Sequence, residues 1–164
     1  MLFLQSVDYR SLMNQALKEA KKAMQKEEIP VGAVIWDIKQ NSIISSAHNL
    51  SISLCNPTAH AEILAIEKAA QKIKNYRLTN CILVVTLEPC IMCLGAIVQA
   101  RLEGVIFGAK DPKSGAICSS LDYTKLKGLN HSFWVIKGVL AKESASLLQH
   151  FFRAKRKGEV PKWS

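Results

Sequence analysis

The sequence predicts an α/β fold in which a central mixed sheet of about five strands has helices on both faces. Short runs of aliphatic and β-branched residues alternate along the chain with longer segments of helical periodicity, and this alternation is typical of layered α/β domains. The length of 164 residues and the hydrophobic content of 49% suit one compact domain. No linker-like or repetitive stretch interrupts residues 1–164, so we expect a single domain.

Four helices are predicted from periodicity and turn signals. Apolar residues recur at helical spacing in the first segment, and Pro30 stops that helix. Thr58 is expected to cap the second helix. Pro89 is expected to open the third, because a proline at a helix start has no N–H to leave unpaired. The predicted helices cover residues 7–28, 62–74, 89 to about 101, and 143–156.

Five strands are predicted from short runs that are rich in branched residues. Residues 37–42 form a polar turn, so the strands on either side of it are expected to make a hairpin. Residues 110–130 are rich in Lys, Ser and Gly and are expected to be irregular. The predicted strands cover residues 31–36, 43–48, 81–86, 104–108 and 133–136.

The net charge indicates an anionic partner. The chain has 22 Lys plus Arg against 13 Asp plus Glu, a balance of +9, which favours nucleic acid or an acidic membrane surface over a generally basic, soluble surface. Basic residues gather near the C-terminus, where such a run is usually only a solvated helix end. This tail comprises Arg153, Lys155, Arg156, Lys157 and Lys162, offset by Glu159.

No apolar run is long enough to span a membrane. The first residues, Met1–Leu4, are apolar but lack a basic leader and a long apolar segment, so we expect no signal peptide and a cytoplasmic protein. Thiols stay reduced in the cytosol. The five cysteines are therefore expected to be metal ligands or core residues rather than disulfides.

Two short segments carry the residues best suited to catalysis, His60-Ala61-Glu62 and Pro89-Cys90-Ile91-Met92-Cys93. Cys90 and Cys93 are spaced to share one face of a helix, in a first turn whose free N–H groups and dipole favour thiolate. With His60 they form a zinc-binding set that leaves a fourth tetrahedral position for water. An open position of this kind distinguishes catalytic from structural zinc.

Glu62 is the candidate for proton transfer. On a regular helix it would point about 200° away from His60, so both can border one site only if the helix meets that site at its N-terminus. A carboxylate beside zinc-activated water can accept a proton and later deliver protons to the substrate. On its own, the Cys-x-x-Cys motif also fits a redox pair or half of a structural metal site. Glu62 on its own also fits a solvated position on a helix. The combined pattern is typical of zinc deaminases.

The chain resembles the bacterial tRNA-specific adenosine deaminases of the cytidine/deoxycytidylate deaminase superfamily over most of its length. The resemblance implies a cytidine-deaminase-like three-layer α/β/α sandwich, a homodimer and one Zn²⁺ per subunit. It implies hydrolytic deamination of adenosine to inosine at the wobble position of a tRNA anticodon stem-loop, with zinc-activated hydroxide attacking adenine C6. The similar segments are Ile29–Val34, Pro57–Ile63, Asn75–Leu78, Val85–Cys90, Val105–Ala109, Leu129–His131 and Phe151–Arg153.

The same resemblance assigns roles to individual residues. It makes His60, Cys90 and Cys93 the zinc ligands and Glu62 the proton shuttle. Asn49 matches an asparagine that contacts the nucleoside, although without the family it is an ordinary turn residue.

The RNA contacts are expected on two basic segments. Asp111 and Lys113 follow a predicted strand and are expected to reach the flanking nucleotides, while Arg153 is expected to bind phosphate in the basic tail. His131 fits either a phosphate contact or a turn, and Cys55 is left outside the ligand set. The chain departs from its relatives near the expected nucleotide entrance, with His48 where they often have Trp and Asn56 where they often have Asp.

Two other functions remain compatible with these residues. A deaminase of a free base or nucleoside would share the zinc chemistry, but it does not account for the charge of +9. A zinc-stabilised RNA-binding subunit without activity would be expected to lack Glu62.

Overall fold

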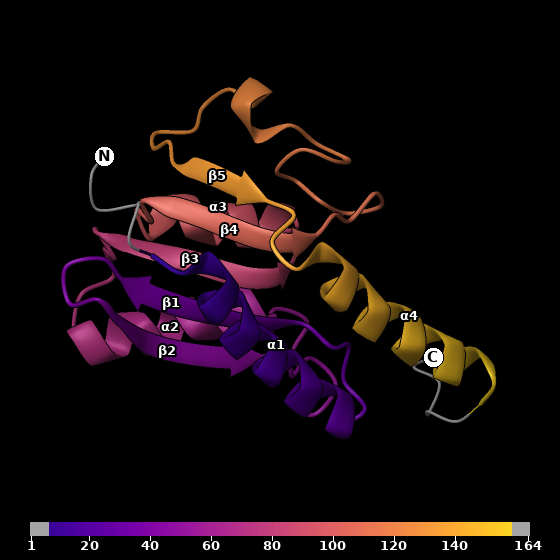
Figure 1. Ribbon diagram of the computed structural model, residues 1–164. Coiled ribbons are helices and arrows are strands. Elements are labelled where there is room, and N and C mark those ends of the chain that lie inside the picture. Colours follow the sequence, from indigo (N-terminus) through magenta and orange to yellow (C-terminus); the bar gives the residue numbers. More distant parts are fainter. Residues whose placement is uncertain (1–6, 159–164) are drawn as a thin grey trace.

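One five-stranded mixed sheet organises the computed structural model, which describes residues 7–158 (Figure 1). The strand order is β2-β1-β3-β4-β5. Strand β1 runs antiparallel to its neighbours β2 and β3, whereas β4 runs parallel to its neighbours β3 and β5. The strands are β1 (Gly32–Asp37), β2 (Ser42–His48), β3 (Cys81–Leu87), β4 (Gly104–Ala109) and β5 (Trp134–Lys137).

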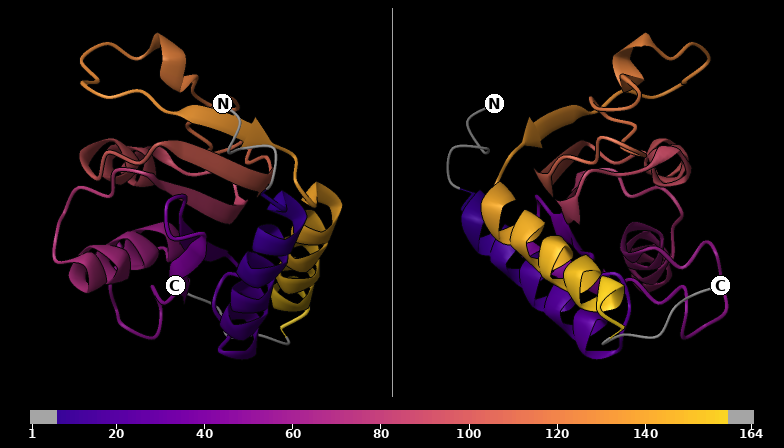
Figure 2. Two further views of the ribbon diagram at one scale, coloured as in Figure 1. Left: turned by 60° about the vertical axis from the view of Figure 1, so that its left-hand side comes forward. Right: turned by 90° about the vertical axis from the view of Figure 1, so that its right-hand side faces the viewer.

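Helices cover both faces of this sheet, as predicted. The helices α1 and α4 lie on one face, and α2 and α3 lie on the other (Figure 2). The result is the three-layer α/β/α sandwich expected from the sequence. The helices are α1 (Tyr9–Gln25), α2 (Ala61–Ile73), α3 (Ile91–Gln99) and α4 (Ala141–Arg156), and a 3₁₀ turn, η2, spans Tyr123–Lys125.

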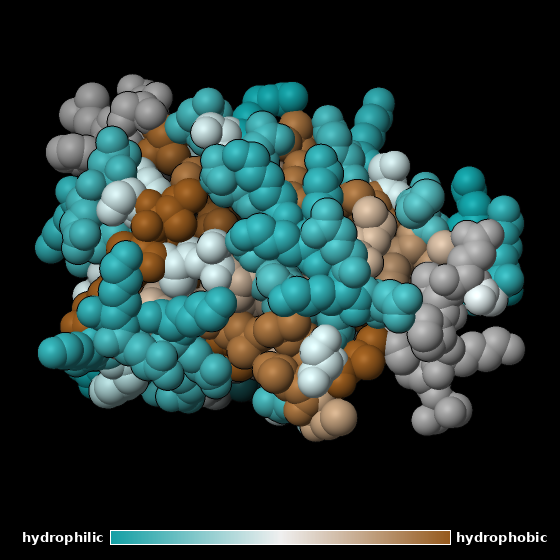
Figure 3. All heavy atoms as spheres, turned by 90° about the horizontal axis from the view of Figure 1, so that it is seen from below, coloured by the Kyte–Doolittle hydropathy of each residue, from teal (hydrophilic) through white to brown (hydrophobic). Residues whose placement is uncertain are grey.

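The central strands are apolar because both of their faces are covered. Every residue of β1 and β4 is buried. Alternate side chains such as Val34, Val84 and Ile106 pack toward α1, and their neighbours Ile35 and Val85 pack toward α2 and α3. The outer surface contrasts with this core, since hydrophilic side chains cover most of the face in Figure 3, with hydrophobic patches between them.

Helix α1 ends earlier than the sequence predicts. The amide of Glu28 donates to the Ala23 carbonyl and that of Glu27 to the Met24 carbonyl, which is the hydrogen-bond pattern of a Schellman cap. Glu27 takes the left-handed conformation at φ 60°. Because glycine usually occupies that position, the sequence carries no signal for a stop at Gln25.

Two other predicted boundaries were wrong. Thr58 does not cap α2, because its N–H and hydroxyl donate to the Asn56 side chain, and His60 occupies the N-cap position. Helix α3 begins at Ile91 rather than at Pro89, with Cys90 at its N-cap in an extended conformation. In both candidate segments, the first predicted ligand, His60 or Cys90, therefore lies just before a helix.

The residues that matter for function gather where β3 and β4 end. Residues 49–60 lead into α2, residues 87–90 connect β3 to α3, and residues 110–119 follow β4. These three segments surround one cavity. Within residues 7–158, no helix combines the length and the apolar character needed to cross a membrane.

Candidate active site

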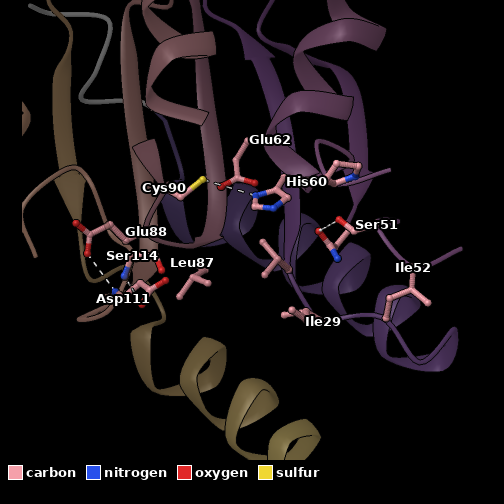
Figure 4. Close-up of a pocket in the computed structure, with 13 residues that line it drawn as sticks. Ile29, Ser51, Ile52, His60, Glu62, Leu87, Glu88, Cys90, Asp111 and Ser114 are labelled. Atoms are coloured by element: carbon pink, nitrogen blue, oxygen red, sulfur yellow. Dashed lines mark hydrogen bonds between the residues drawn. The ribbon is translucent and has the colours of Figure 1, made fainter. Parts of the chain in front are cut away.

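A cavity of about 370 Å³ opens at this end of the sheet (Figure 4), within the size range of small-molecule sites. Its lining combines apolar and polar side chains. The apolar lining includes Ile29, Val31, Ile52, Pro57 and Leu87, and the polar lining includes Asn49, Ser51, His60, Glu62, Glu88, Cys90, Asp111 and Ser114.

His60, Cys90 and Cys93 stand at metal-binding distances. Nδ1 of His60 lies 3.7 Å from Sγ of Cys90 and 3.6 Å from Sγ of Cys93. Bonds of about 2.3 Å to sulfur and about 2.0–2.1 Å to nitrogen at tetrahedral angles place a nitrogen and a sulfur about 3.6 Å apart. Among the described residues this is the group that offers three such ligand atoms, and its spacing fits zinc.

Hydrogen bonds link the three side chains, and a bound cation would displace the protons in these bonds. A hydrogen bond from the Cys93 thiol lowers the pKa of Cys90 to about 4, with a further contribution from His60. The same interaction raises the pKa of Cys93, and the hydrogen bond with Cys90 raises that of His60. Zinc binds thiolates and neutral imidazole, so it would take the place of these protons.

Glu62 lies beside this set, as Figure 4 shows. Its side chain is buried, with 4% exposed, and burial raises its pKa to about 7. A neighbouring cation favours the carboxylate form, so a bound metal would oppose the effect of burial on this group. Because His60 is the N-cap and lies outside the helical repeat, the two side chains reach one site despite their spacing.

Comparisons with known proteins agree with this arrangement. The MafB19-like deaminase family matches residues 7–156. The chain is 48% identical over 145 residues to a tRNA-specific adenosine deaminase of Haemophilus influenzae, spanning 88% of this chain and 83% of that protein. It is 44% identical over 145 residues to one of Bacillus subtilis, spanning 88% and 89%. The chain belongs to the tRNA-specific adenosine deaminase family.

Solved structures extend the comparison to the fold. A structure from a study of A-to-I editing by tRNA:A34 deaminases has a TM-score of 0.81 at 38% identity and covers 84% of this chain and 99% of that chain. A guanine deaminase from Nitrosomonas europaea has a TM-score of 0.76 at 22% identity and covers 87% and 83%. The second likeness concerns the fold alone.

Glu28 organises one wall of the deaminase pocket. It is fully buried and accepts four hydrogen bonds: from the Asn49 side chain at 3.2 Å, from the backbone of Ile52 at 3.3 Å, and from the backbone and hydroxyl of Ser53 at 2.7 and 2.8 Å. It therefore holds Asn49 and the loop after it. The sequence analysis missed Glu28, because its neighbour Glu27 is exposed and nothing local distinguishes the two.

Glu88 organises the opposite wall. Its carboxylate accepts hydrogen bonds from four backbone amides between Asp111 and Ser119 and from the Ser119 hydroxyl. Burial raises its pKa, but the hydrogen bonds from Ser119 and the amides outweigh burial and lower the pKa overall. Sequence reasoning missed this role too. A glutamate directly before Pro-Cys was the available signal, since a charged side chain seldom ends a buried strand without partners.

The predicted substrate-binding residues do not all line the pocket. Asn49 and Asp111 line the pocket. Lys113 is exposed beside it, with its backbone N–H on the Asp111 carboxylate. Arg153 is an exposed residue of α4 and does not line the cavity. Lys162 and Glu159 of the tail, like Met1–Leu4, lie outside the described residues.

The remaining candidates have local partners. His48 contacts Glu19 at 2.8 Å. Asn56 accepts hydrogen bonds from the backbone and hydroxyl of Thr58. His131 lies 2.7 Å from the Leu102 carbonyl, which makes it an anchor for its loop. Cys55 is exposed and outside the metal-binding group.

Proposed function

We propose that this chain hydrolyses adenosine to inosine at the wobble position of a tRNA anticodon, with one zinc ion bound per subunit. The observation that carries the proposal is a buried carboxyl group, Glu62, beside a His-Cys-Cys set with tetrahedral spacing in one pocket. The tRNA substrate is supported by relatives that are named tRNA-specific adenosine deaminases. Because that substrate is a tRNA, we also assign the chain to the cytoplasm.

His60, Cys90 and Cys93 would hold the zinc ion. Three protein ligands leave a fourth position open. Zinc held by these three residues would lower the pKa of a bound water from about 15.7 to about 7 and so would supply a nucleophile at neutral pH.

Glu62 moves the protons of the reaction. It accepts a proton from the attacking water, gives it to N1 of adenine, and helps the amine leave as ammonia once oxygen has joined C6. The water contributes its oxygen to inosine and its protons to the ring and the leaving group, so the hydrolysis balances.

Asn49 is proposed to contact the target base or its ribose. It lines the pocket, and its side-chain NH₂ is held by Glu28, so the amide has a defined orientation. Asp111 and Lys113, on the opposite rim, are proposed to meet the flanking nucleotides. A base in a single-stranded loop reaches such a pocket at low cost, because extruding it requires little unpairing.

Basic residues on two neighbouring helices offer a path for the RNA backbone. Helices α1 and α4 lie side by side (Figure 2). Lys18 and Lys21 are exposed on α1, and Arg153 and Arg156 are exposed on α4. We propose phosphate binding along this surface, which predicts that affinity for a stem-loop falls with a log–log salt slope of about −0.7 per phosphate neutralised.

A second copy of the chain is proposed to cover α3. This helix has no charged residue, and its outward positions include Ile91, which is 55% exposed, and Gly95. A helix that is hydrophobic all round is normally buried, so a homodimer through α3 accounts for its composition. Sedimentation is expected to give a dimer for the wild type and a monomer for Gly95→Glu, and a monomeric wild type would contradict the proposal.

The function is tested with an anticodon stem-loop that carries adenosine at the wobble position. Free adenosine, guanine and cytidine serve as competing substrates, and Glu62→Gln, with matched zinc content, serves as the inactive control. Inosine is expected in the stem-loop alone, and the control is expected to bind RNA without turnover. Turnover of a free base or nucleoside instead would indicate an enzyme of nucleotide salvage. RNA binding without turnover by the wild type would indicate a binding subunit.

A further inference from the structure

The Glu88 carboxylate has no free capacity to contact a substrate. Oε1 accepts from the backbone amides of Ile117, Cys118 and Ser119 at 3.1, 2.7 and 3.0 Å, and Oε2 accepts from the Asp111 amide at 3.1 Å and from the Ser119 hydroxyl. A carboxylate has about four lone-pair sites. With five donors around it, Glu88 is saturated by its own protein.

Backbone dipoles, rather than a cation, balance the charge of Glu88. Glu88 is buried, with 2% of its surface exposed. Within residues 7–158, no Lys, Arg or His forms an ion pair with it. Successive amides that converge on an anion form a nest. Here the anion is internal, and removing it would leave several amides without partners, at a cost for each one that is buried.

The nest fixes the chain on both sides of the pocket rim. The Ala116 amide donates to the Pro89 carbonyl at 2.8 Å, and Gly115 pairs with Cys90 through the backbone. A Cβ on Gly115 would lie 2.5 Å from the Glu88 carboxyl carbon. The segment therefore approaches Glu88 as closely as it does because residue 115 is glycine.

The same segment carries two pocket-lining side chains. Asp111 and Ser114 both line the cavity. The Asp111 carboxylate accepts from the amides of Lys113 and Ser114, while its own amide is held by Glu88 (Figure 4). The position of this rim thus depends on one buried carboxylate that lies behind it.

We propose that Glu88 is a positioning residue for the deamination proposed above, holding the rim from Asp111 to Ser119 in the shape that receives the nucleotides beside the target adenosine. It acts through the rim, and because Gly115 of the rim also pairs with the backbone of Cys90, the zinc content of the variants distinguishes this route from an effect on the zinc ligands. This inference rests on the proposed function for its kinetic consequence, and on the hydrogen-bond geometry alone for its structural one.

The test compares Glu88→Gln and Glu88→Ala with Asp122→Asn. The control removes the same charge from a partly exposed carboxylate that caps η2 and does not line the pocket. Zinc content is expected to stay at the wild-type level in all three. KM for the stem-loop is expected to rise about tenfold or more for Glu88→Ala, the equivalent of one lost hydrogen bond to a charged group. Glu88→Gln keeps one acceptor oxygen, so its KM is expected to lie between those of the wild type and Glu88→Ala. In both variants kcat is expected to change far less than KM.

A second variant and a second readout keep the test decisive. Gly115→Ala pushes the rim from the other side with Glu88 intact and is expected to raise KM in the same way. Amide hydrogen exchange at Ile117, Cys118 and Ser119 is expected to accelerate in Glu88→Gln. Loss of zinc in step with activity, or an unchanged KM with accelerated exchange, would overturn the inference. A wild type inactive on the stem-loop would refute the proposed function, whereas unchanged exchange would refute the anchoring separately.

Discussion

Replacing Glu28 by alanine is expected to lower the free energy of unfolding by about 3 kcal/mol. The carboxylate is fully buried and accepts four hydrogen bonds, of which the two from Ser53 are the shortest at 2.7 and 2.8 Å. A hydrogen bond to a charged group contributes about 1.5–3 kcal/mol, so these two account for about 3–6 kcal/mol. Because Ser53 is an exposed residue and water can replace part of the loss, the lower end applies.

The matched control is the neighbouring residue. Glu27 is exposed, so Glu27→Ala removes the same charge and is expected to change stability by less than about 0.5 kcal/mol. Urea unfolding of the zinc-loaded proteins measures the difference, and for a chain of this size about 3 kcal/mol corresponds to a fall in Tm of about 6–12 °C. If both variants unfold at the same urea concentration, the Glu28 carboxylate does not hold the loop that carries Asn49.

Three further changes probe the core, the electrostatics and the metal. In Gly32→Ala the new methyl carbon would lie 2.0 Å from the Ala16 carbonyl oxygen, so a loss of at least about 2 kcal/mol is expected in equilibrium unfolding, and wild-type stability would show that α1 can retreat. Burial raises the pKa of Glu19, but hydrogen bonds from Lys22 and His48 outweigh it and lower the pKa below 4.5. The stability advantage of wild type over Glu19→Gln is therefore present above pH 4.5 and shrinks as pH falls through the lowered pKa, and a gap independent of pH would contradict this pairing. Removing zinc with a chelator is expected to abolish turnover and lower Tm, with both restored by added zinc, and full activity of metal-free protein would exclude zinc catalysis.

The layered fold was accessible from the sequence because its signals are local. Strands β1, β3 and β4 are covered on both faces, so they appear as continuous apolar runs whose limits the structure confirms to within one residue. The end of α1 was not accessible. Its left-handed residue is Glu27 instead of glycine, and a cap of that kind leaves no compositional mark.

The candidate site likewise contains some residues that could be predicted from the sequence and others that could not. His60, Cys90 and Cys93 could be predicted as a set, because the two segments that carry them together form a recognisable pattern of side chains suited to zinc. The roles of Glu28 and Glu88 could not, since each depends on a loop more than 20 residues away in the chain closing around it. A buried carboxylate and an exposed one have the same letter in a sequence, and tertiary hydrogen bonds alone distinguish them.

The most direct test of the central claim follows the oxygen atom. Wild-type protein and Glu62→Gln, matched in zinc content, are incubated in ¹⁸O-labelled water with a stem-loop that carries adenosine at the wobble position, and the nucleosides are analysed by mass spectrometry. We expect one ¹⁸O atom in inosine at that position with the wild type, and unreacted adenosine with the variant. Unlabelled inosine, or equal turnover by Glu62→Gln, would contradict hydrolysis by water under the control of Glu62.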